Sequence, residues 1–267
     1  SALDSFQSSG VVVVAAGNDT SSTEVNVQAG LPQIATELNE AWLVVGNIDT
    51  SGSTISSSSV TRKGNQCGVV AEYCIQADGT HITAGDDDST GDYASLSGTS
   101  MAAPIVSGSV ALLSEAFPNH TPAQLADRLL ASANNDFFTA TGTTSFINGI
   151  THGYNAEFGH GILDLKKALE PVSTSSVLLG NSSLSSSSSS FNHVGDAIRV
   201  PFSSTRISLP QSFGDSIQNS LKGKVAYFYD SLNGGFAFDM SSLISNDKKI
   251  TNLYNAADFN VPQNIMN

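Results

Sequence analysis

Apolar residues in the first part of the chain gather in short runs that have the character of buried strands. Residues 11–16 form an uninterrupted run, Val-Val-Val-Val-Ala-Ala, that ends at Gly17. A run without polar alternation is typical of a strand covered on both faces, as in a parallel sheet between helices. Residues 42–46 repeat this pattern, and residues 74–77 are a shorter example. These runs predict a mostly parallel sheet.

Helical signals lie before and after these strands. Residues 1–9 carry apolar positions at helical spacing and are followed by Gly10, a common stop. Residues 99–117 are small and apolar all round, which predicts a buried helix with Pro104 in an early turn. Residues 121–124, Thr-Pro-Ala-Gln, form a helix-start signature. Strands and helices in this order predict an α/β fold.

Two polar stretches between the apolar runs are predicted to lie at the surface. Residues 49–59 are rich in Ser, and residues 79–91 form a loop with three consecutive Asp residues at 86–88. Such an acidic run is typical of a solvated loop. The residues alone leave open a second role, in which the run binds a cation or attracts basic substrates.

The character of the chain changes after Pro171. Residues 173–190 are mostly Ser, a composition that cannot form a packed core and that predicts a linker. Short strands are predicted further on, at 198–202, 225–228 and 236–240. We therefore divide the chain into an α/β part at 1–170, a Ser-rich linker at 171–197 and a truncated β-rich segment at 198–267.

Composition and charge exclude several classes of function. The 267 residues include 11 basic and 24 acidic side chains, for a formal net charge of −13. This balance argues against nucleic acid or an anionic membrane surface as the main partner. No stretch reaches the roughly 18–20 apolar residues of a spanning helix. The sequence begins at Ser1, without an initiator Met and without the pattern of a signal peptide. We therefore expect this chain to be a piece of a longer protein.

Cys67 and Cys74 are the two cysteines of the chain. Their spacing fits a small disulfide loop, and two unrelated free thiols are the alternative. Two ligands without a nearby His pattern argue against a zinc site. An acidic surface rich in Ser and Thr suits export, where disulfides persist.

The sharpest chemical feature is Ser100, placed where the buried helix begins. A Ser hydroxyl is a weak nucleophile that needs a general base and donors for an oxyanion. The first turn of a helix offers free backbone N–H groups and the positive end of the helix dipole. A Ser that simply caps a core helix is the alternative.

Residues 98–104, Gly-Thr-Ser-Met-Ala-Ala-Pro, resemble the nucleophile motif of the subtilisin-like serine proteases, or subtilases, at every position. Residues 12–18, Val-Val-Val-Ala-Ala-Gly-Asn, resemble the strand that leads to the oxyanion Asn of that family. Residues 158–164 resemble the segment that closes its catalytic domain, with residues 165–169 as the final helix. The resemblance covers about residues 1–170.

The resemblance implies a role for each matching residue. Ser100 would be the nucleophile, and Asn18 would donate its side-chain amide to the oxyanion together with the Ser100 backbone N–H. Ala15, Ala16 and Gly17 would line one wall of the primary specificity pocket. The fold would be a three-layer α/β arrangement with a mostly parallel sheet, of which residues 1–170 form the C-terminal half.

The Asp and the His that complete a subtilase triad precede the oxyanion Asn in the family. None of the five histidines has the family's His-Gly-Thr context, and all of them follow Asn18: His81, His120, His152, His160 and His193. We interpret them as structural or surface residues. The resemblance therefore places the catalytic Asp and His upstream of this chain, and we expect the chain alone to be inactive.

A narrower resemblance concerns the C-terminal part. Residues 208–215, 226–230 and 236–240 resemble the stretch between the exported passenger and the β-barrel translocator of autotransporter proteases. Residues 65–74 resemble the paired-Cys segment of this subgroup, although Asp78 stands where Pro is usual. The resemblance implies a secreted or cell-surface protein, protein or peptide substrates, the missing N-terminal half of the domain, and a translocator barrel.

The sequence therefore predicts a serine endopeptidase fragment. A structural calcium ion is common in subtilases, but no loop here clearly matches its ligands, and we assign no metal site. One alternative is a catalytically inactive subtilase-like passenger that acts as an adhesin or binding module. The other is a lipase or esterase, which would carry Gly-x-Ser-x-Gly, whereas Ala102 stands at the last position of that motif.

Overall fold

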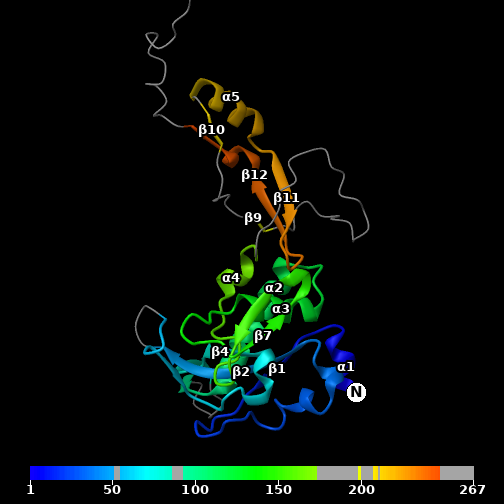
Figure 1. The fold of residues 1–267 in the computed structure, drawn as a ribbon, viewed down its shortest axis with the longest axis vertical. Helices are drawn as coiled ribbons and strands as arrows, with labels where there is room; N and C mark the ends of the chain where they lie inside the picture. The colour runs from blue at the N-terminus through cyan, green and yellow to red at the C-terminus, as the bar shows by residue number, and fades with distance from the viewer. Residues whose placement is uncertain (51–54, 86–92, 173–197, 200–206, 210, 247–267) are drawn as a thin grey trace, which may run out of the picture. The chain divides into compact units, whose positions relative to one another are not determined.

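The computed structural model describes residues 1–50, 55–85, 93–172, 198–199, 207–209 and 211–246 (Figure 1). The chain divides into two compact units. The first unit holds residues 1–196 together with the loop Tyr229–Gly235, and the second holds 197–228 and 236–267. The acidic run at 86–88 and nearly all of the predicted linker lie outside the described residues.

The sheet of the first unit is built around β2, Trp42–Thr50. β2 pairs in parallel with β1, Val12–Ala15, and with β4, Cys74–Asp78, while its far end pairs antiparallel with β3, Val60–Arg62. Residues 42–48 of β2 are buried. The predicted strands and the mixed α/β class with a mostly parallel sheet are confirmed.

The burial predicted for the first strand is wrong. β1 is only half-buried along its length. Among the described strands it pairs with β2 alone, so its other edge is open. A run of valines predicts what a strand can bury, whereas actual burial depends on the neighbours that are present.

The long helix α2, Thr99–Ala116, packs against β1, β2 and β4. One face is buried through Ala102, Val106 and Leu113, but Ile105 and Leu112 are 37% and 55% exposed on the other. The helix is confirmed with Pro104 in its second turn, whereas burial on all sides is wrong for the described structure.

The other helices of the first unit have side-chain caps, and the cap of α3 at Thr121 is the one predicted from the sequence. α3, Pro122–Ser132, starts with a capping box in which Thr121 and Gln124 bond each other's backbone N–H groups. α4, Leu165–Leu169, is capped by the Asp164 side chain, and α1 spans Ala2–Gln7. Short 3-10 turns lie at Leu31–Gln33, Thr36–Leu38, Gly68–Tyr73 and Ile147–Gly149.

Two hairpins have weak sequence signals. β5, Ile82–Gly85, pairs antiparallel with β6, Tyr93–Leu96, so the prediction of a loop over 79–91 is wrong at 82–85. β7, Gly142–Ser145, pairs with β8, Thr151–Tyr154. β7 and β8 are rich in Gly and Thr, and none of the residues in these four strands is buried, so a pattern of apolar residues could not predict them.

The described residues of the second unit form short strands and the helix α5, Gln211–Leu221. The elements in chain order are β9 Ile198–Arg199, β10 Ile207–Leu209, α5 Gln211–Leu221, β11 Val225–Tyr229, β12 Gly235–Asp239, a 3-10 turn Met240–Leu243 and β13 Ile244–Asn246. One sheet has the order β11, β12, β9, and β10 pairs in parallel with β13. The strands predicted at 225–228 and 236–240 are confirmed. Helix α5 was missed, although Phe213, Ile217 and Leu221 recur at helical spacing.

Across the described parts of the chain, every helix is too short or too polar to cross a membrane.

Candidate active site

The site is built where the loop after β1 meets the first turn of α2. Gly17 has a φ of +120°, and a Cβ there would lie 2.6 Å from the Asn65 side-chain oxygen. Its N–H donates to the hydroxyl of Thr99 at 3.3 Å, and its carbonyl accepts from the Asn65 N–H at 3.0 Å. The loop needs glycine at this point, and these bonds hold Asn18 beside α2.

The orientation of the Asn18 side chain is fixed by Thr99. The Asn18 Oδ1 atom accepts hydrogen bonds from the Thr99 backbone N–H at 2.9 Å and from the Thr99 hydroxyl at 3.0 Å. Because a backbone N–H can only donate, the atom that faces it must be the amide oxygen. The Nδ2 group is therefore left as a donor away from Thr99.

Ser100 lies in the first turn of α2 and is exposed. The N–H groups of Met101 and Ala102 donate to the Gly98 carbonyl, and that of Thr99 donates to Asn18. Among the described residues, no hydrogen bond of the Ser100 N–H is found. Pro104 has no N–H to bond the Ser100 carbonyl four positions earlier. The nucleophile candidate thus combines an accessible hydroxyl with an available backbone donor at a helix N-terminus.

Gly98 allows the close approach of the two motifs. Its φ is +152°, and a Cβ on it would lie 3.1–3.2 Å from the Asn18 amide atoms. Asn18 and Gly98 both line a hollow of about 390 Å³. The remaining wall is polar and consists of Asn47, Asp49, Lys63, Thr80, His81 and Ser97. The structure therefore brings Asn18 and the start of α2 together at a recess large enough for a side chain.

The predicted wall residues lie next to this site. Ala15 ends β1 and is half-buried, whereas Ala16 is fully buried. Their role in a specificity pocket, together with that of Gly17, stays a prediction. A larger hollow of about 790 Å³ lies elsewhere, beside β3 and the rings of Phe137, Phe138 and Phe158, and it includes neither Asn18 nor Ser100.

The structure describes four of the five histidines, since His193 lies outside the described residues. None of these four is hydrogen-bonded to Ser100. His152 and His160 meet through their Nδ1 atoms at 2.9 Å, and the Nε2 atom of His160 faces the Glu72 carbonyl at 2.9 Å. Burial, and then the neighbouring His152, lowers the pKa of His160 to about 4. These two rings are structural.

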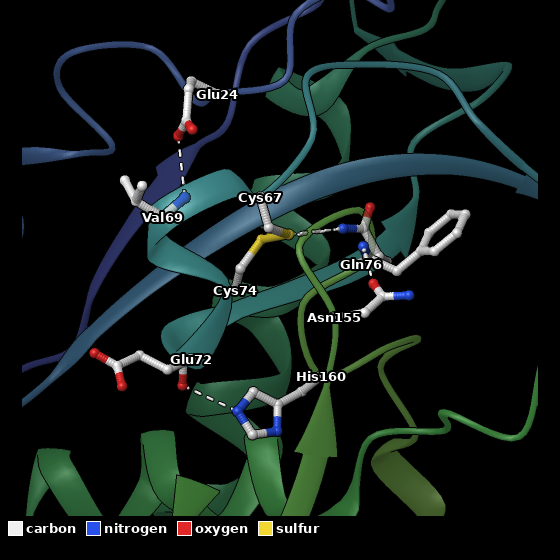
Figure 2. Close-up of a disulfide and its surroundings, with 9 residues drawn as sticks. Glu24, Cys67, Val69, Glu72, Cys74, Gln76, Asn155 and His160 are labelled. Carbon is white, nitrogen blue, oxygen red and sulfur yellow. Dashed lines mark hydrogen bonds between the residues drawn. A yellow bond between two sulfur atoms is a disulfide. The ribbon is translucent and has the colours of Figure 1, made fainter. Parts of the chain in front are cut away.

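The disulfide between Cys67 and Cys74 is present, as predicted (Figure 2). It encloses the 3-10 turn at 68–73, and both cysteines are buried. The side-chain amide of Gln76 donates to the Cys67 sulfur at 3.3 Å, and Glu24 accepts from the Val69 N–H at 3.0 Å. The bridge therefore anchors the segment that leads into β4.

No group of three or more His, Cys, Asp or Glu side chains suited to a metal ion occurs in the described residues. Asp19 has its pKa lowered by hydrogen bonds from the hydroxyl and the N–H of Ser21, and it lies on the surface. Sequence reasoning missed the roles of Thr99 and Asn65, which lie inside quoted motifs but act through contacts 81 and 46 positions away.

Comparisons with known proteins agree with these motifs. The model of the subtilase family matches residues 2–161. Subtilisin DY of Bacillus licheniformis is 32% identical over 134 residues, which are 50% of this chain and 43% of that protein. The Neisserial autotransporter lipoprotein NalP of Neisseria meningitidis serogroup B is 27% identical over 165 residues, 59% of this chain and 14% of that protein. The chain therefore spans less than half of these relatives.

Among solved structures, fervidolysin from Fervidobacterium pennivorans, a keratinolytic enzyme related to subtilisin, is 28% identical and has a TM-score of 0.44. The match covers 63% of this chain and 24% of the fervidolysin chain.

Proposed function

This chain belongs to the subtilase family, and from that premise we propose that it carries the nucleophile and the oxyanion site of a serine endopeptidase. Ser100 attacks the carbonyl carbon of a peptide bond. Asn18 Nδ2 and the Ser100 N–H stabilise the oxyanion. The observation that carries the proposal is the pair of Thr99 hydrogen bonds to Asn18 Oδ1, since these bonds make Nδ2 the free donor.

The reaction needs a base that the described residues do not bring to Ser100. We propose that a His and its orienting Asp lie upstream of Ser1. The His takes the Ser100 hydroxyl proton as the Ser100 oxygen bonds to the substrate carbon, and it then gives that proton to the leaving amine. Water, activated by the same His, hydrolyses the acyl-enzyme and restores Ser100.

Two unpartnered faces support an upstream half that packs against this one. The edge of β1 away from β2 is unpaired among the described strands. On α2, Ile105 and Leu112 form an exposed apolar face. A sheet edge and an apolar helix side are the surfaces that an α/β domain normally covers. Residues 1–267 alone are then inactive or nearly so.

The relatives support a proposal for the substrates and the location of this protein. We propose protein or peptide substrates, because this chain belongs to the subtilase family and is similar to subtilisin DY. The likeness to an autotransporter lipoprotein supports a secreted or cell-surface protein whose export uses a translocator barrel. The disulfide suits such an oxidising location. A structural calcium ion stays an expectation of the family.

Peptidase activity tests the proposal directly. A protein that includes the residues before Ser1 is assayed with a denatured protein substrate and with a short-chain ester, beside its Ser100→Ala variant and residues 1–267 alone. We expect protein hydrolysis that is lost in Ser100→Ala and absent from residues 1–267. Ester hydrolysis without peptide hydrolysis, or activity that survives Ser100→Ala, would contradict the proposal. Loss of both activities in the longer protein would favour an inactive binding module.

A further inference from the structure

A charged side chain that takes no part in the contacts of the candidate active site is fully buried. Arg128, on α3, has no exposed side-chain surface. Its guanidinium donates to the carbonyls of Ala168 and Glu170 at the end of α4, at 2.6 and 3.0 Å, and it stacks over the Phe117 ring at 4.1 Å. A buried cation is tolerated only with an opposite charge and further hydrogen bonds.

The opposite charge comes from a residue 102 positions away. Asp230 Oδ2 lies 2.7 Å from the Arg128 guanidinium, and the Asp230 side chain is also fully buried. The same oxygen accepts from the Val172 N–H at 2.9 Å. The other oxygen accepts from the N–H groups of Leu232 and Gly234, at 3.0 and 2.7 Å. Both carboxylate oxygens therefore have partners, and the ion pair is closed off from water.

The loop around Asp230 is shaped to fit. Its ends are joined by the bond from the Asp230 N–H to the Gly234 carbonyl at 3.0 Å. A Cβ on Gly234 would lie 2.7 Å from the Arg128 Nη1 atom and 3.0 Å from the Phe117 ring. Leu232 is 2% exposed. Any larger residue at Gly234 would push the loop away from the guanidinium.

Two further side chains hold the loop from other elements. The Nε2 atom of His120 donates to the Leu232 carbonyl at 3.1 Å, because a carbonyl can only accept. The Asn148 side-chain amide donates to the Ser231 carbonyl at 2.9 Å. We name the surface formed by Phe117, His120, Arg128, Asn148 and the backbone of 168–172 the Asp230 socket.

We propose that the Asp230 socket is an intramolecular binding site whose ligand is the loop Tyr229–Gly235, and that it keeps the C-terminal segment attached to the first unit after the chain is cut within residues 173–197. Withdrawal of the loop would break the Arg128–Asp230 ion pair and its hydrogen bonds and would expose the Leu232 side chain to water, which disfavours release. The proposal concerns binding, so its outcome does not depend on peptidase activity.

A single cut tests the proposal on the full 267-residue chain. A recognition sequence for a site-specific protease is inserted in the Ser run 185–190, and complete cleavage is checked on a denaturing gel. Size-exclusion chromatography with light scattering then measures the mass of the native species. We expect both pieces to elute together with the mass of one chain. Separation of the wild-type pieces at micromolar concentration would overturn the proposal.

Variants show whether the described contacts are responsible. Asp230→Asn removes the counter-charge, and we expect the two cut pieces to separate at concentrations at least tenfold higher than in the wild type. Asp239→Asn is the matched control, since this exposed carboxylate of the same hairpin accepts from the Ser241 N–H. Equal retention of the pieces in Asp230→Asn and the wild type would overturn the proposal.

A second substitution covers the case in which Asp230→Asn fails to fold when uncut, as judged by circular dichroism. Leu232→Ala removes only buried apolar contact of the loop and leaves the ion pair in place. We expect it also to weaken retention of the cut pieces, and retention equal to that of the wild type would count against the socket.

Discussion

The amide oxygen of Asn18 accepts two hydrogen bonds from one residue, Thr99, at 2.9 and 3.0 Å. Thr99 precedes the proposed nucleophile and is itself buried. It therefore fixes the direction of the amide donor relative to Ser100, and the proposed oxyanion site depends on a residue whose own side chain is buried.

Replacement of Thr99 by Val tests this positioning role. The backbone bond to Asn18 stays, but the hydroxyl loses both its bond to Asn18 Oδ1 and its bond from the Gly17 N–H, so the amide is held less firmly. We expect kcat of the active protein to fall about tenfold, less than for loss of a direct oxyanion donor, with little change in KM. Thr99→Ser keeps a hydroxyl and should keep most of the activity. An unchanged kcat in Thr99→Val would contradict a role of the Thr99 hydroxyl in positioning Asn18.

Asn18→Ala should have a larger effect, because it removes the proposed donor itself. Loss of one such donor lowers kcat by about 10²–10³-fold. Steady-state kinetics on a peptide substrate measures this loss. Asn39→Ala, which changes an exposed Asn of the same unit, is the control and should leave kcat as in the wild type. A rise in KM with kcat unchanged would show that Asn18 acts in substrate binding instead.

The disulfide should contribute measurable stability to residues 1–267. Its cysteines are seven positions apart. Closing a loop of this length lowers the entropy of the unfolded chain, which raises the free energy of unfolding by about 2–3 kcal/mol at room temperature. The double variant Cys67→Ala, Cys74→Ala should lose about this much in urea unfolding. A reducing agent should destabilise the wild type but not the double variant. Equal stability of both proteins would show that the bridge is dispensable.

The pH dependence of stability should include His120. Burial, and then the charge of Arg128, lowers the pKa of this ring to about 4. Because the folded pKa lies below the unfolded value of about 6.5, the unfolded state binds more protons between these two values. Stability is therefore lost as pH falls from about 6.5 to 4, by about 1–2 kcal/mol after allowance for the part of the ring that solvent reaches.

His120→Gln removes this titration and keeps an amide donor for the Leu232 carbonyl. Urea unfolding at several pH values compares the variant with the wild type. We expect the difference in unfolding free energy between the two proteins to change across pH 6.5–4 and to be flat above pH 7. A flat difference over the whole range would show that His120 titrates normally.

Much of the central fold could be predicted from sequence because its signals are local. The apolar run of β2, the capping box at Thr121 and the small apolar residues of α2 each specify an element within a few positions. The burial of β1 and of the outer face of α2 could not be predicted in this way, because burial depends on neighbouring elements rather than on the run itself.

The candidate site shows the same division. Ser100 and Asn18 were found through family motifs, whereas the role of Thr99 appears only when two segments 81 positions apart meet. The return of Tyr229–Gly235 to the first unit has no local signal. It depends on Arg128, an ordinary-looking helix residue whose partner lies 102 positions further on.

Fluorophosphonate labelling of the protein that includes the residues before Ser1 tests the central claim most directly. The oxygen of a Ser that a base and an oxyanion site have activated attacks the phosphorus of this reagent and displaces fluoride, which leaves a stable phosphonyl adduct. We predict one adduct, located by peptide mass spectrometry on Ser100, formed much more slowly in Asn18→Ala and absent from residues 1–267 alone. An adduct on another residue, or no adduct on the longer protein, would contradict the assignment of Ser100 as the nucleophile.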